Sequence, residues 1–480
     1  MDYKLPRGTE DFLPEVTTKR EITSNLLRSI ATDFGYHEIE TPMFENLEVF
    51  SRTSGESSDI VTKEMYVFKD RGDRMMALRP EGTAGVVRAF VEHKLYATEE
   101  LPYKVYYLQP AFRYERPQKG RYRQHTQFGL EAIGASLPEN DAELILQIFH
   151  MYSSLGLQNF YFKLNCLGDD ASRKKYVAEL KKYFEPHLDE LCEDCHARYE
   201  KNPLRILDCK VDCNKDFFKN APKIGDFISE ESKAKFQTIT DYLEEYQVPY
   251  VLDPGLVRGL DYYSELVFEI YEKGHEDNGA IGAGGRYNSL VKELGGPDLP
   301  CVGFATGLER LIQALDDNHI FDQLDTGLIA YVMPLEKSVF QYAFNVAMHL
   351  RFNEIPTEFD YACRSLKAQF KSVDKKKAKF AILIGNTEML ASSVTIKNNE
   401  TKEQKLIRVE DLVNFIMDEL LKMQEAAEKE ASHEGSCCCE EHADKDSCCC
   451  QDKCACDEHE HKEKDGCCHN GEHCECKHEK

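Results

Sequence analysis

Positively charged side chains are concentrated in the segment FRYERPQKGRYRQHTQFGLE, residues 112–131. Its cations are Arg113, Arg116, Lys119, Arg121 and Arg123, and the polar residues Gln127 and Glu131 follow them. A guanidinium can bind two phosphate oxygens at once, whereas a carboxylate suits an ammonium or a polarised N–H. The segment therefore predicts a pocket for a small molecule whose positive end lies beside a phosphate. The alternative is a solvated hairpin with surface ion pairs.

Two apolar and aromatic stretches, 105–115 and 127–133, flank the basic residues and predict a β-hairpin with a long loop. Because side chains alternate along a strand, Arg113 and Glu115 share one face of the first strand. Gln127 and Glu131 share one face of the second strand in the same way. If both faces point the same way, the charged and polar groups meet across an open sheet.

Three other stretches carry residues that could join this group. Residues 256–265, LVRGLDYYSE, place Arg258 before two adjacent tyrosines, and residues 303–311, GFATGLERL, place Arg310 early in a helix. Residues 282–290, GAGGRYNSL, read as a glycine-rich turn, but their glycine spacing differs from the dinucleotide-binding fingerprint. Each stretch alone also fits surface charge or ordinary packing.

The elements that position these residues predict an α+β fold with an antiparallel sheet and helices to one side. We expect a helix over 17–34, an edge strand over 36–44 that contains Pro42, and a helix that Thr83 caps. Residues from about 170 to 245 are rich in Lys and Glu and predict an inserted helical module. Together these elements form a first domain, residues 1–325.

The pattern changes near Asp325, where strands begin to alternate with helices. This βαβαβ order predicts a separate α/β domain over residues 326–425 with a mostly parallel sheet. We expect strands over 327–334, 356–361 and 380–385, and helices over 339–352, 366–376 and 409–423. Residues 426–480 show no apolar periodicity, so we expect them to be disordered without a ligand.

Overall charge and hydropathy narrow the function classes. The 480 residues carry a formal net charge of −25, so a polyanion must meet a local basic surface. No apolar run reaches about 18 residues, so we expect no membrane span. The N-terminal residues show neither a basic-then-apolar stretch nor a small-residue cleavage site, so we expect no signal peptide and a cytoplasmic location.

The 19 cysteines are unevenly distributed, since twelve lie in the acidic tail among several histidines. In a reducing cytosol such a cluster indicates metal ligation before disulfides. We expect this tail to bind soft or borderline ions such as zinc, nickel or copper(I); the alternative is a solubilising tail with reduced thiols. The tail cysteines are Cys437, Cys438, Cys439, Cys448, Cys449, Cys450, Cys454, Cys456, Cys467, Cys468, Cys474 and Cys476.

Four other cysteines lie inside the charged insertion. They read C-x2-C-x13-C-x3-C, a spacing that is compatible with a structural zinc knuckle. Nothing in the remaining motifs requires a metal there, so free thiols are the alternative. The four residues are Cys192, Cys195, Cys209 and Cys213.

Taken together, the motifs resemble the class II aminoacyl-tRNA synthetases and, within them, the histidyl-tRNA synthetases. GYHEIETPMFE (35–45) resembles class motif 1, the basic segment resembles motif 2 and GFATGLERL resembles motif 3. LVRGLDYY and GGRYNSL resemble the two strings specific to the histidine enzymes. The resemblance covers roughly residues 1 to 425 and stops before the tail.

The resemblance implies an ATP-dependent ligase that forms histidyl-adenylate and transfers histidine to the 3′ end of tRNA(His). Arg113 is then expected at the α-phosphate, Arg121 and Arg310 at the outer phosphates and adenine, and Glu115 at adenine. Arg258 is expected as the distinctive catalytic group beside the α-phosphate, where other class members place a metal ion. ATP would enter with Mg²⁺.

The resemblance also implies a histidine pocket and further partners. Residues expected at the α-amino group are Glu81, Gly82 and Thr83, and those expected around the rest of histidine are Gln127, Glu131, Arg258, Tyr262 and Tyr263. Motif 1 implies a homodimer, and the α/β domain resembles an anticodon-binding domain. A basic stripe there could face phosphates or merely be solvated; it comprises Arg364, Lys367, Lys371, Lys375, Lys376 and Lys377.

Two rival functions remain. One is an inactive synthetase-like regulatory subunit of histidine biosynthesis, which would bind histidine without activating it. The arginines of the motifs and the domain after Asp325 argue against it. The other is a metal-buffering protein that works through its tail, which the intact core makes at most a second function.

Overall fold

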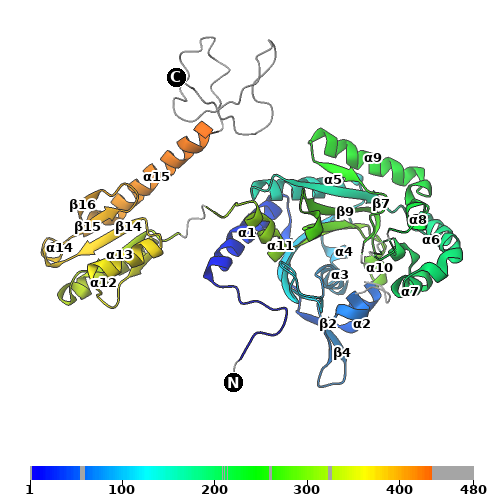
Figure 1. The fold of residues 1–480 in the computed structure, drawn as a ribbon, viewed down its shortest axis with the longest axis horizontal. Helices are drawn as coiled ribbons and strands as arrows, with labels where there is room; N and C mark the ends of the chain where they lie inside the picture. The colour runs from blue at the N-terminus through cyan, green and yellow to red at the C-terminus, as the bar shows by residue number, and fades with distance from the viewer. Residues whose placement is uncertain are drawn as a thin grey trace, which may run out of the picture. The chain divides into compact units, whose positions relative to one another are not determined.

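The computed structural model describes residues 3–53, 60–207, 209, 211–212, 214–258, 262–322 and 327–434. The chain divides into two compact units, Met1–Leu324 and Asp325–Lys480, which are described separately (Figure 1). Within the described ranges, no helix has the length and apolar character needed to cross a membrane.

The first unit is built on a sheet with the strand order β1-β5-β6-β11-β10-β9-β7-β8 among its described residues. The inner neighbours are antiparallel, whereas β1 and β8 pair in parallel at the two edges. This arrangement confirms the predicted α+β class, and β5 and β6 form the predicted hairpin. The strands are β1 (His37–Glu38), β5 (Tyr103–Phe112), β6 (Gln124–Ile133), β7 (Phe160–Cys166), β8 (Tyr250–Leu252), β9 (Ser264–Glu272), β10 (Gly282–Arg286) and β11 (Cys301–Gly307).

Helices cover both faces of this sheet, although the sequence predicted helices to one side only (Figure 1). Apolar periodicity shows which face of a helix is buried, but it does not show which face of the sheet that helix covers. One layer comprises α1 (Pro14–Asp33), α5 (Pro138–Ser154), α9 (Glu230–Glu245) and α11 (Leu308–Asp317), and the other α3 (Thr83–Glu92) and α10 (Leu290–Glu293). A short helix, α4 (Leu95–Thr98), follows α3.

The strand predicted over 36–44 is interrupted at Pro42. Its first part is the edge strand β1, and its second part begins β2 in a separate small sheet ordered β2-β4-β3. Proline has no N–H to donate to a ladder, so it suits the point where the chain leaves one sheet for another. The remaining elements of this region are β2 (Phe44–Asn46), α2 (Leu47–Thr53), β3 (Val67–Lys69) and β4 (Met75–Leu78).

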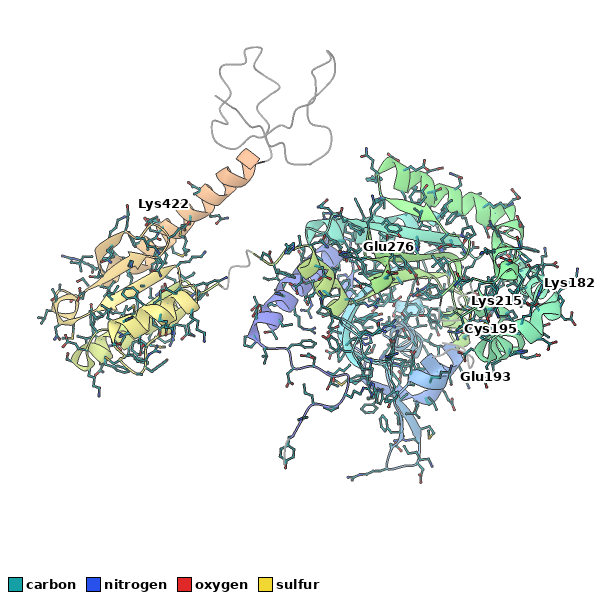
Figure 2. All side chains as sticks on the ribbon, in the orientation of Figure 1. Lys182, Glu193, Cys195, Lys215, Glu276 and Lys422 are labelled. Atoms are coloured by element: carbon teal, nitrogen blue, oxygen red, sulfur yellow. The ribbon has the colours of Figure 1, made fainter. Side chains whose placement is uncertain are left out.

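The charged insertion forms a helical module with its own core. Its helices are α6 (Asp170–Phe184), α7 (Glu193–Lys201) and α8 (Asp216–Lys219), and Figure 2 labels Lys182, Glu193, Cys195 and Lys215 in it. The sequence placed the end of this module near residue 245. However, α9 packs on α5 and contributes Ile239 and Leu243 to the main core.

The glycine-rich stretch predicted as a turn is instead the inner strand β10. Glycine is required where β10 passes its neighbours, because a Cβ on Gly284 would lie 2.3 Å from the Gly303 carbonyl oxygen and 2.5 Å from the Phe268 ring. Glycine usually weakens a strand, but here the close approach of backbone and ring leaves no room for a side chain.

The second unit contains a sheet ordered β13-β12-β14-β15-β16. β12, β13 and β14 are parallel and alternate with helices as predicted, whereas β15 and β16 add an antiparallel hairpin that the sequence did not suggest. Its elements are β12 (Ala330–Pro334), α12 (Phe340–Phe352), β13 (Thr357–Phe359), α13 (Leu366–Lys375), β14 (Phe380–Ile384), α14 (Asn386–Leu390), β15 (Ser393–Asn398), β16 (Gln404–Arg408) and α15 (Leu412–Glu434). The helix α15 therefore continues past residue 426, where the sequence predicted that order ends.

Candidate active site

A cavity of about 490 Å³ opens on the first unit, and most of the predicted site residues line it. They come from segments far apart in the sequence, including the hairpin loop, the start of α3, the stretch before β9 and the start of α11. The predicted residues in its wall are Glu81, Thr83, Arg113, Glu115, Arg121, Gln127, Arg258, Tyr262, Tyr263 and Arg310. Gly82 and Glu131 are not among the described lining residues.

The hairpin loop supplies two arginines to the cavity. Arg113 lies just beyond the end of β5, so the predicted strand ends at Phe112 rather than at Glu115. Its Nε donates to the Pro80 carbonyl oxygen at 2.8 Å, which fixes the guanidinium. Glu115 lies between the two cations: its Oε1 is 3.8 Å from Arg113 Nη1 and its Oε2 is 2.7 Å from Arg121 Nε.

The other cations of the segment have different roles. Lys119 Nζ lies 3.6 Å from an Asp317 carboxylate oxygen on α11. The Arg123 guanidinium lies over the Tyr114 ring, 3.6 Å from its centroid. The basic segment is therefore partly a ligand surface and partly a set of contacts that fold the loop.

Arg310 brings a third guanidinium from the first turn of α11. Its Nη1 donates to the Ala280 carbonyl oxygen at 2.5 Å and its Nη2 to the Asn278 carbonyl oxygen at 2.8 Å. Burial, together with the nearby Arg121, lowers the pKa of Arg310 from its usual value. Both guanidinium groups line the cavity, and a bound polyanion would relieve the repulsion between them.

Arg258 lies in the wall of the same cavity and forms an ion pair with Glu269 on β9. Its guanidinium is 5.6 Å from the centroid of the Tyr263 ring. Glu269 accepts a second hydrogen bond from the Tyr271 hydroxyl at 2.6 Å. Sequence reasoning missed both Glu269 and Tyr271. The available signal was that these two residues follow Arg258 closely in the sequence and, two positions apart in a strand, share one face.

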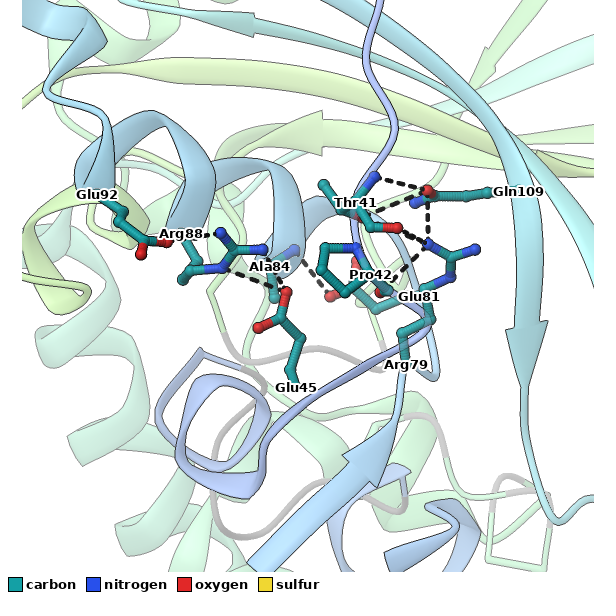
Figure 3. Close-up of polar contacts among 9 residues, drawn as sticks. All are labelled: Thr41, Pro42, Glu45, Arg79, Glu81, Ala84, Arg88, Glu92 and Gln109. Atoms are coloured by element: carbon teal, nitrogen blue, oxygen red, sulfur yellow. Dashed lines mark hydrogen bonds and ion pairs between the residues drawn. The ribbon is translucent and has the colours of Figure 1, made fainter. Parts of the chain in front are cut away.

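Glu81 is buried and caps α3. Its carboxylate accepts hydrogen bonds from the Thr83 N–H at 2.6 Å and the Ala84 N–H at 3.0 Å, the second of which Figure 3 shows. Burial raises the pKa of Glu81. The prediction that Thr83 caps this helix is therefore wrong. The Thr83 N–H is one of the groups that Glu81 caps, and the Thr83 hydroxyl donates to Glu131 Oε1 at 2.6 Å.

The base of α3 is held by a neighbouring polar network (Figure 3). Arg79 Nη1 donates to the Thr41 carbonyl oxygen and to Gln109 Oε1, both at 2.7 Å. Arg88 forms an ion pair with Glu45, so α3 is also fixed to the small sheet. These contacts hold the segment that carries Glu81 in place.

Glu131 lies behind the cavity wall with only 1% of its surface exposed. It accepts hydrogen bonds from Thr83, Tyr107 and Tyr287. Burial raises its pKa to about 8 despite these donors, so the carboxyl is mainly protonated at neutral pH. Glu131 therefore does not line the cavity itself, whereas Thr83 and Tyr287, which donate hydrogen bonds to it, do.

Gln127 and two tyrosines complete the polar wall. Gln127 Oε1 accepts the Gly82 N–H at 2.9 Å, which joins β6 to the start of α3. The rings of Tyr262 and Tyr263 are 4.8 Å apart between centroids, and both are buried. Aromatic walls with polar hydroxyls suit a planar ligand that also forms hydrogen bonds.

His125 also lines the cavity and was missed from the sequence. Burial and the nearby Arg113 lower its pKa to about 3, so the imidazole is neutral and can accept a hydrogen bond. The sequence predicted this strand only from residue 127, whereas β6 begins at Gln124, so that His125 lies two residues before Gln127 on the same face.

Three of the predicted zinc-knuckle cysteines lie close together. Cys192, Cys195 and Cys209 gather with Asp212, which the sequence reading did not include. Cys213 lies outside the described residues, as do all twelve tail cysteines. Metal binding by the tail therefore stays a prediction from composition.

Comparisons with known proteins agree with this geometry. A family model described as histidyl-tRNA synthetase matches residues 8–311, and one described as an anticodon binding domain matches residues 330–419. A *Staphylococcus aureus* histidine–tRNA ligase is 46% identical over 415 residues, which cover 86% of this chain and 99% of that protein.

Solved structures give the same assignment. The crystal structure of apo *S. aureus* histidyl-tRNA synthetase matches with a TM-score of 0.74 and 40% identity, covering 86% of this chain and all of that one. A histidyl-tRNA synthetase from *Nostoc* sp. PCC 7120 shares the fold, with a TM-score of 0.65, 21% identity, and coverage of 87% of this chain and 100% of that chain. By its sequence, its fold and the residues in its cavity, the chain belongs to the histidyl-tRNA synthetase family.

Proposed function

We propose that this chain is a histidine–tRNA ligase that activates L-histidine with ATP and then transfers the histidyl group to tRNA(His). The observation that carries the proposal is the meeting of Arg113, Arg121, Arg258 and Arg310 in one cavity beside a wall of tyrosines. The *S. aureus* relative named histidine–tRNA ligase supports the same activity, because nearly its whole length aligns with this chain.

In the first step, the histidine carboxylate oxygen attacks the α-phosphorus of ATP. A new O–P bond forms, the bond to the β-phosphate oxygen breaks, and pyrophosphate leaves with the electron pair. In this proposal, Arg113 and Arg258 stabilise the charge that builds on the α-phosphate, and Arg121 and Arg310 bind the outer phosphates. ATP would enter as its Mg²⁺ complex, and the carboxylate of Asp277, which lines the cavity, offers oxygen donors suited to that ion.

Histidine would occupy the side of the cavity formed by Gln127, Thr83 and the two tyrosines. Glu81 faces the same space and carries a carboxylate suited to an α-ammonium group. Glu131 would support the imidazole indirectly, through Thr83 and Tyr287, which bond to it and line the cavity. A site of such polar groups penalises apolar analogues, because its own hydrogen-bonding groups would be left unpaired.

In the second step, a hydroxyl at the 3′ end of tRNA attacks the carbonyl carbon of histidyl-adenylate, an ester bond forms, and the bond to the phosphate oxygen breaks so that AMP leaves. The anticodon-domain model that matches residues 330–419 supports a role for the second unit in binding tRNA. A homodimer and a cytoplasmic location are further parts of the proposal and follow from the family. Dimer formation can be checked by light scattering on the purified chain.

The test is histidine-dependent exchange of pyrophosphate into ATP. We expect exchange by the wild type and a loss of about a hundredfold or more in Arg258→Ala, because a donor aimed at transition-state charge is removed. Arg28→Ala is the matched control: Arg28 pairs with Glu38 at 3.1 Å at the surface, and its change should leave the rate within about twofold. A chain ending at Glu434 should exchange like the full chain.

The same assay separates the rival functions. A regulatory subunit that binds histidine without activating it would give no exchange, and a protein that only buffers metal would give none either. Absence of exchange in a folded wild type that binds histidine would overturn the ligase proposal. An Arg258→Ala variant as fast as the wild type would overturn the role given to that arginine.

A further inference from the structure

A compact group of metal-ligating side chains lies in the helical module, away from the lining of the active-site cavity. One ligand atom from each of Cys192, Cys195, Cys209 and Asp212 lies within 4.8 Å of all the others. Cys195 and Asp212 are fully buried, and Cys209 is nearly so. The thiols of Cys192, Cys195 and Cys209 form no disulfide. Figure 2 labels Cys195 and Lys215 within this module.

The distances in this group match a tetrahedral zinc site. With zinc–sulfur bonds of about 2.3 Å and zinc–oxygen bonds of about 2.0 Å, tetrahedral angles place sulfurs about 3.8 Å apart and a sulfur about 3.5 Å from the oxygen. Cys192 Sγ is 3.7 Å from Cys209 Sγ, and Cys209 Sγ is 3.7 Å from Asp212 Oδ2. A disulfide would need about 2.05 Å between the two sulfurs.

The local backbone holds these ligands in place. Cys192 is the N-cap of α7 and Cys195 lies in its first turn, where the helix dipole favours negative charge. The Cys192 N–H donates to Asp212 Oδ2 at 2.9 Å, and the Asp212 N–H donates to Cys209 Sγ at 3.3 Å. Such contacts orient metal ligands in known sites.

One nearby cation offsets the negative charge of the group. Lys215 Nζ lies 2.8 Å from Asp212 Oδ1, whereas the contact with Cys209 Sγ is made by the other oxygen, Oδ2. Three thiolates and a carboxylate around a divalent ion leave a charge of −2, which a lysine partly balances. The carboxylate can therefore use one oxygen for a metal and the other for the lysine.

We propose that Cys192, Cys195, Cys209 and Asp212 bind one structural Zn²⁺ ion that stabilises the helical module. Four protein ligands close the coordination sphere, which is typical of structural rather than catalytic zinc. The core of the module is a small cluster around Tyr176, Phe184 and Ile206, so a bound ion would add to its stability. The cysteine spacing predicted Cys213 as the fourth ligand, whereas among the described residues the fourth ligand is Asp212.

The first test measures bound zinc by mass spectrometry after exposure to zinc and extensive dialysis. Because the tail thiols of the full chain can bind zinc as well, the decisive quantity is the difference in bound zinc between wild type and Cys195→Ser. We expect this difference to be about one zinc ion per chain. The same difference should persist in chains ending at Glu434, since the aligned 86% of this chain already covers 99% of the *S. aureus* relative. Cys363→Ser, in the second unit, is the control and should lose no zinc.

A second variant separates ligation from folding. Asp212→Cys keeps a ligand at that position and should retain the ion, whereas Asp212→Ala should lose it. Cobalt(II) in the shorter chain should show tetrahedral ligand-field and thiolate charge-transfer absorption that Asp212→Ala weakens. A chelator should speed proteolysis within residues 185–225 of the wild type.

Two results would overturn the proposal. One is equal zinc content in wild type, Cys195→Ser and Asp212→Ala. The other is a Cys192–Cys209 disulfide in protein purified without metal chelators, with no zinc in the chain that ends at Glu434.

Discussion

At the level of single residues, the ion pair between Arg258 and Glu269 holds the guanidinium in place, which supports the phosphate-binding role proposed for Arg258. Burial alone would lower the pKa of Arg258, but Glu269 and the neighbouring tyrosines keep it above its usual value. The guanidinium is thus both charged and fixed. Fixed charge requires little reorganisation when negative charge develops on the α-phosphate.

Glu131 gives a prediction about pH. Its folded-state pKa of about 8 lies above its ordinary 4.5, so the folded protein binds this proton more tightly than the unfolded chain. The free energy of unfolding should therefore fall as pH rises from about 4.5 to about 8. Glu131→Gln removes this titration, and each pKa unit is about 1.4 kcal/mol, so its stability relative to wild type should rise by a few kcal/mol across that range.

The measurement is urea unfolding of both proteins at several pH values, followed by tyrosine fluorescence, since all but three of the 24 tyrosines lie in the first unit. Glu139→Gln, at an exposed position, controls for the loss of one carboxylate. A stability difference that stays constant between about pH 5 and 8 would contradict the raised pKa of Glu131.

Motifs predicted the cavity arginines, because these residue types recur at recognisable spacings around phosphate. Glu269 and His125 could not be found in this way. Each owes its position to neighbours on adjacent strands, and a single sequence without the strand register does not reveal those neighbours. Thr83 was misread for a related reason: a carboxylate two residues earlier provides the cap that a local reading assigned to the hydroxyl.

At the level of elements, strand β10 shows how packing overrides local propensity. A run of glycines reads as a turn, but between β9 and β11 it lets the three backbones and the Phe268 ring approach closely. The hairpin β15–β16 was missed for the opposite reason. Its second strand is mostly exposed and carries little apolar alternation, so its pairing is visible only in the fold.

Gly284→Ala tests the close approach in β10. The added Cβ would meet the Gly303 carbonyl oxygen at 2.3 Å, and a backbone atom in an inner strand cannot move aside without disturbing the sheet. We expect the free energy of unfolding of the first unit to drop by about 1–3 kcal/mol, and histidine-dependent exchange to fall with it. Chemical denaturation and the exchange assay measure the two effects.

Gly225→Ala is the matched control, because a Cβ there meets nothing within 4 Å. Its stability should stay within about 0.5 kcal/mol of wild type. Equal stability of the two alanine variants would show that β10 accommodates a side chain and that its glycines serve another purpose.

At the level of the whole molecule, the proposed function assigns histidine activation to the first unit and part of the tRNA binding to the second. Each unit has its own buried core, and the cavity belongs entirely to the first. In the predicted basic stripe of the second unit, Arg364 pairs with Asp360 at 2.8 Å and Lys376 with Glu358 at 2.6 Å. Lys367, Lys371 and Lys375 recur every four residues on α13 and are exposed, so they are the better candidates for phosphate contacts.

The double variant Lys367→Glu/Lys371→Glu should therefore weaken tRNA charging without changing the first step. We expect the KM for tRNA to rise about tenfold and its salt dependence to decrease, because two cations no longer release counterions from phosphates. Histidine-dependent pyrophosphate exchange should stay within about twofold, since it needs no tRNA. Lys422→Glu, an exposed lysine on α15, is the control and should change neither rate. If the double variant charged tRNA as well as the wild type, α13 would be a solvated face, and the tRNA contact of this unit would have to lie elsewhere.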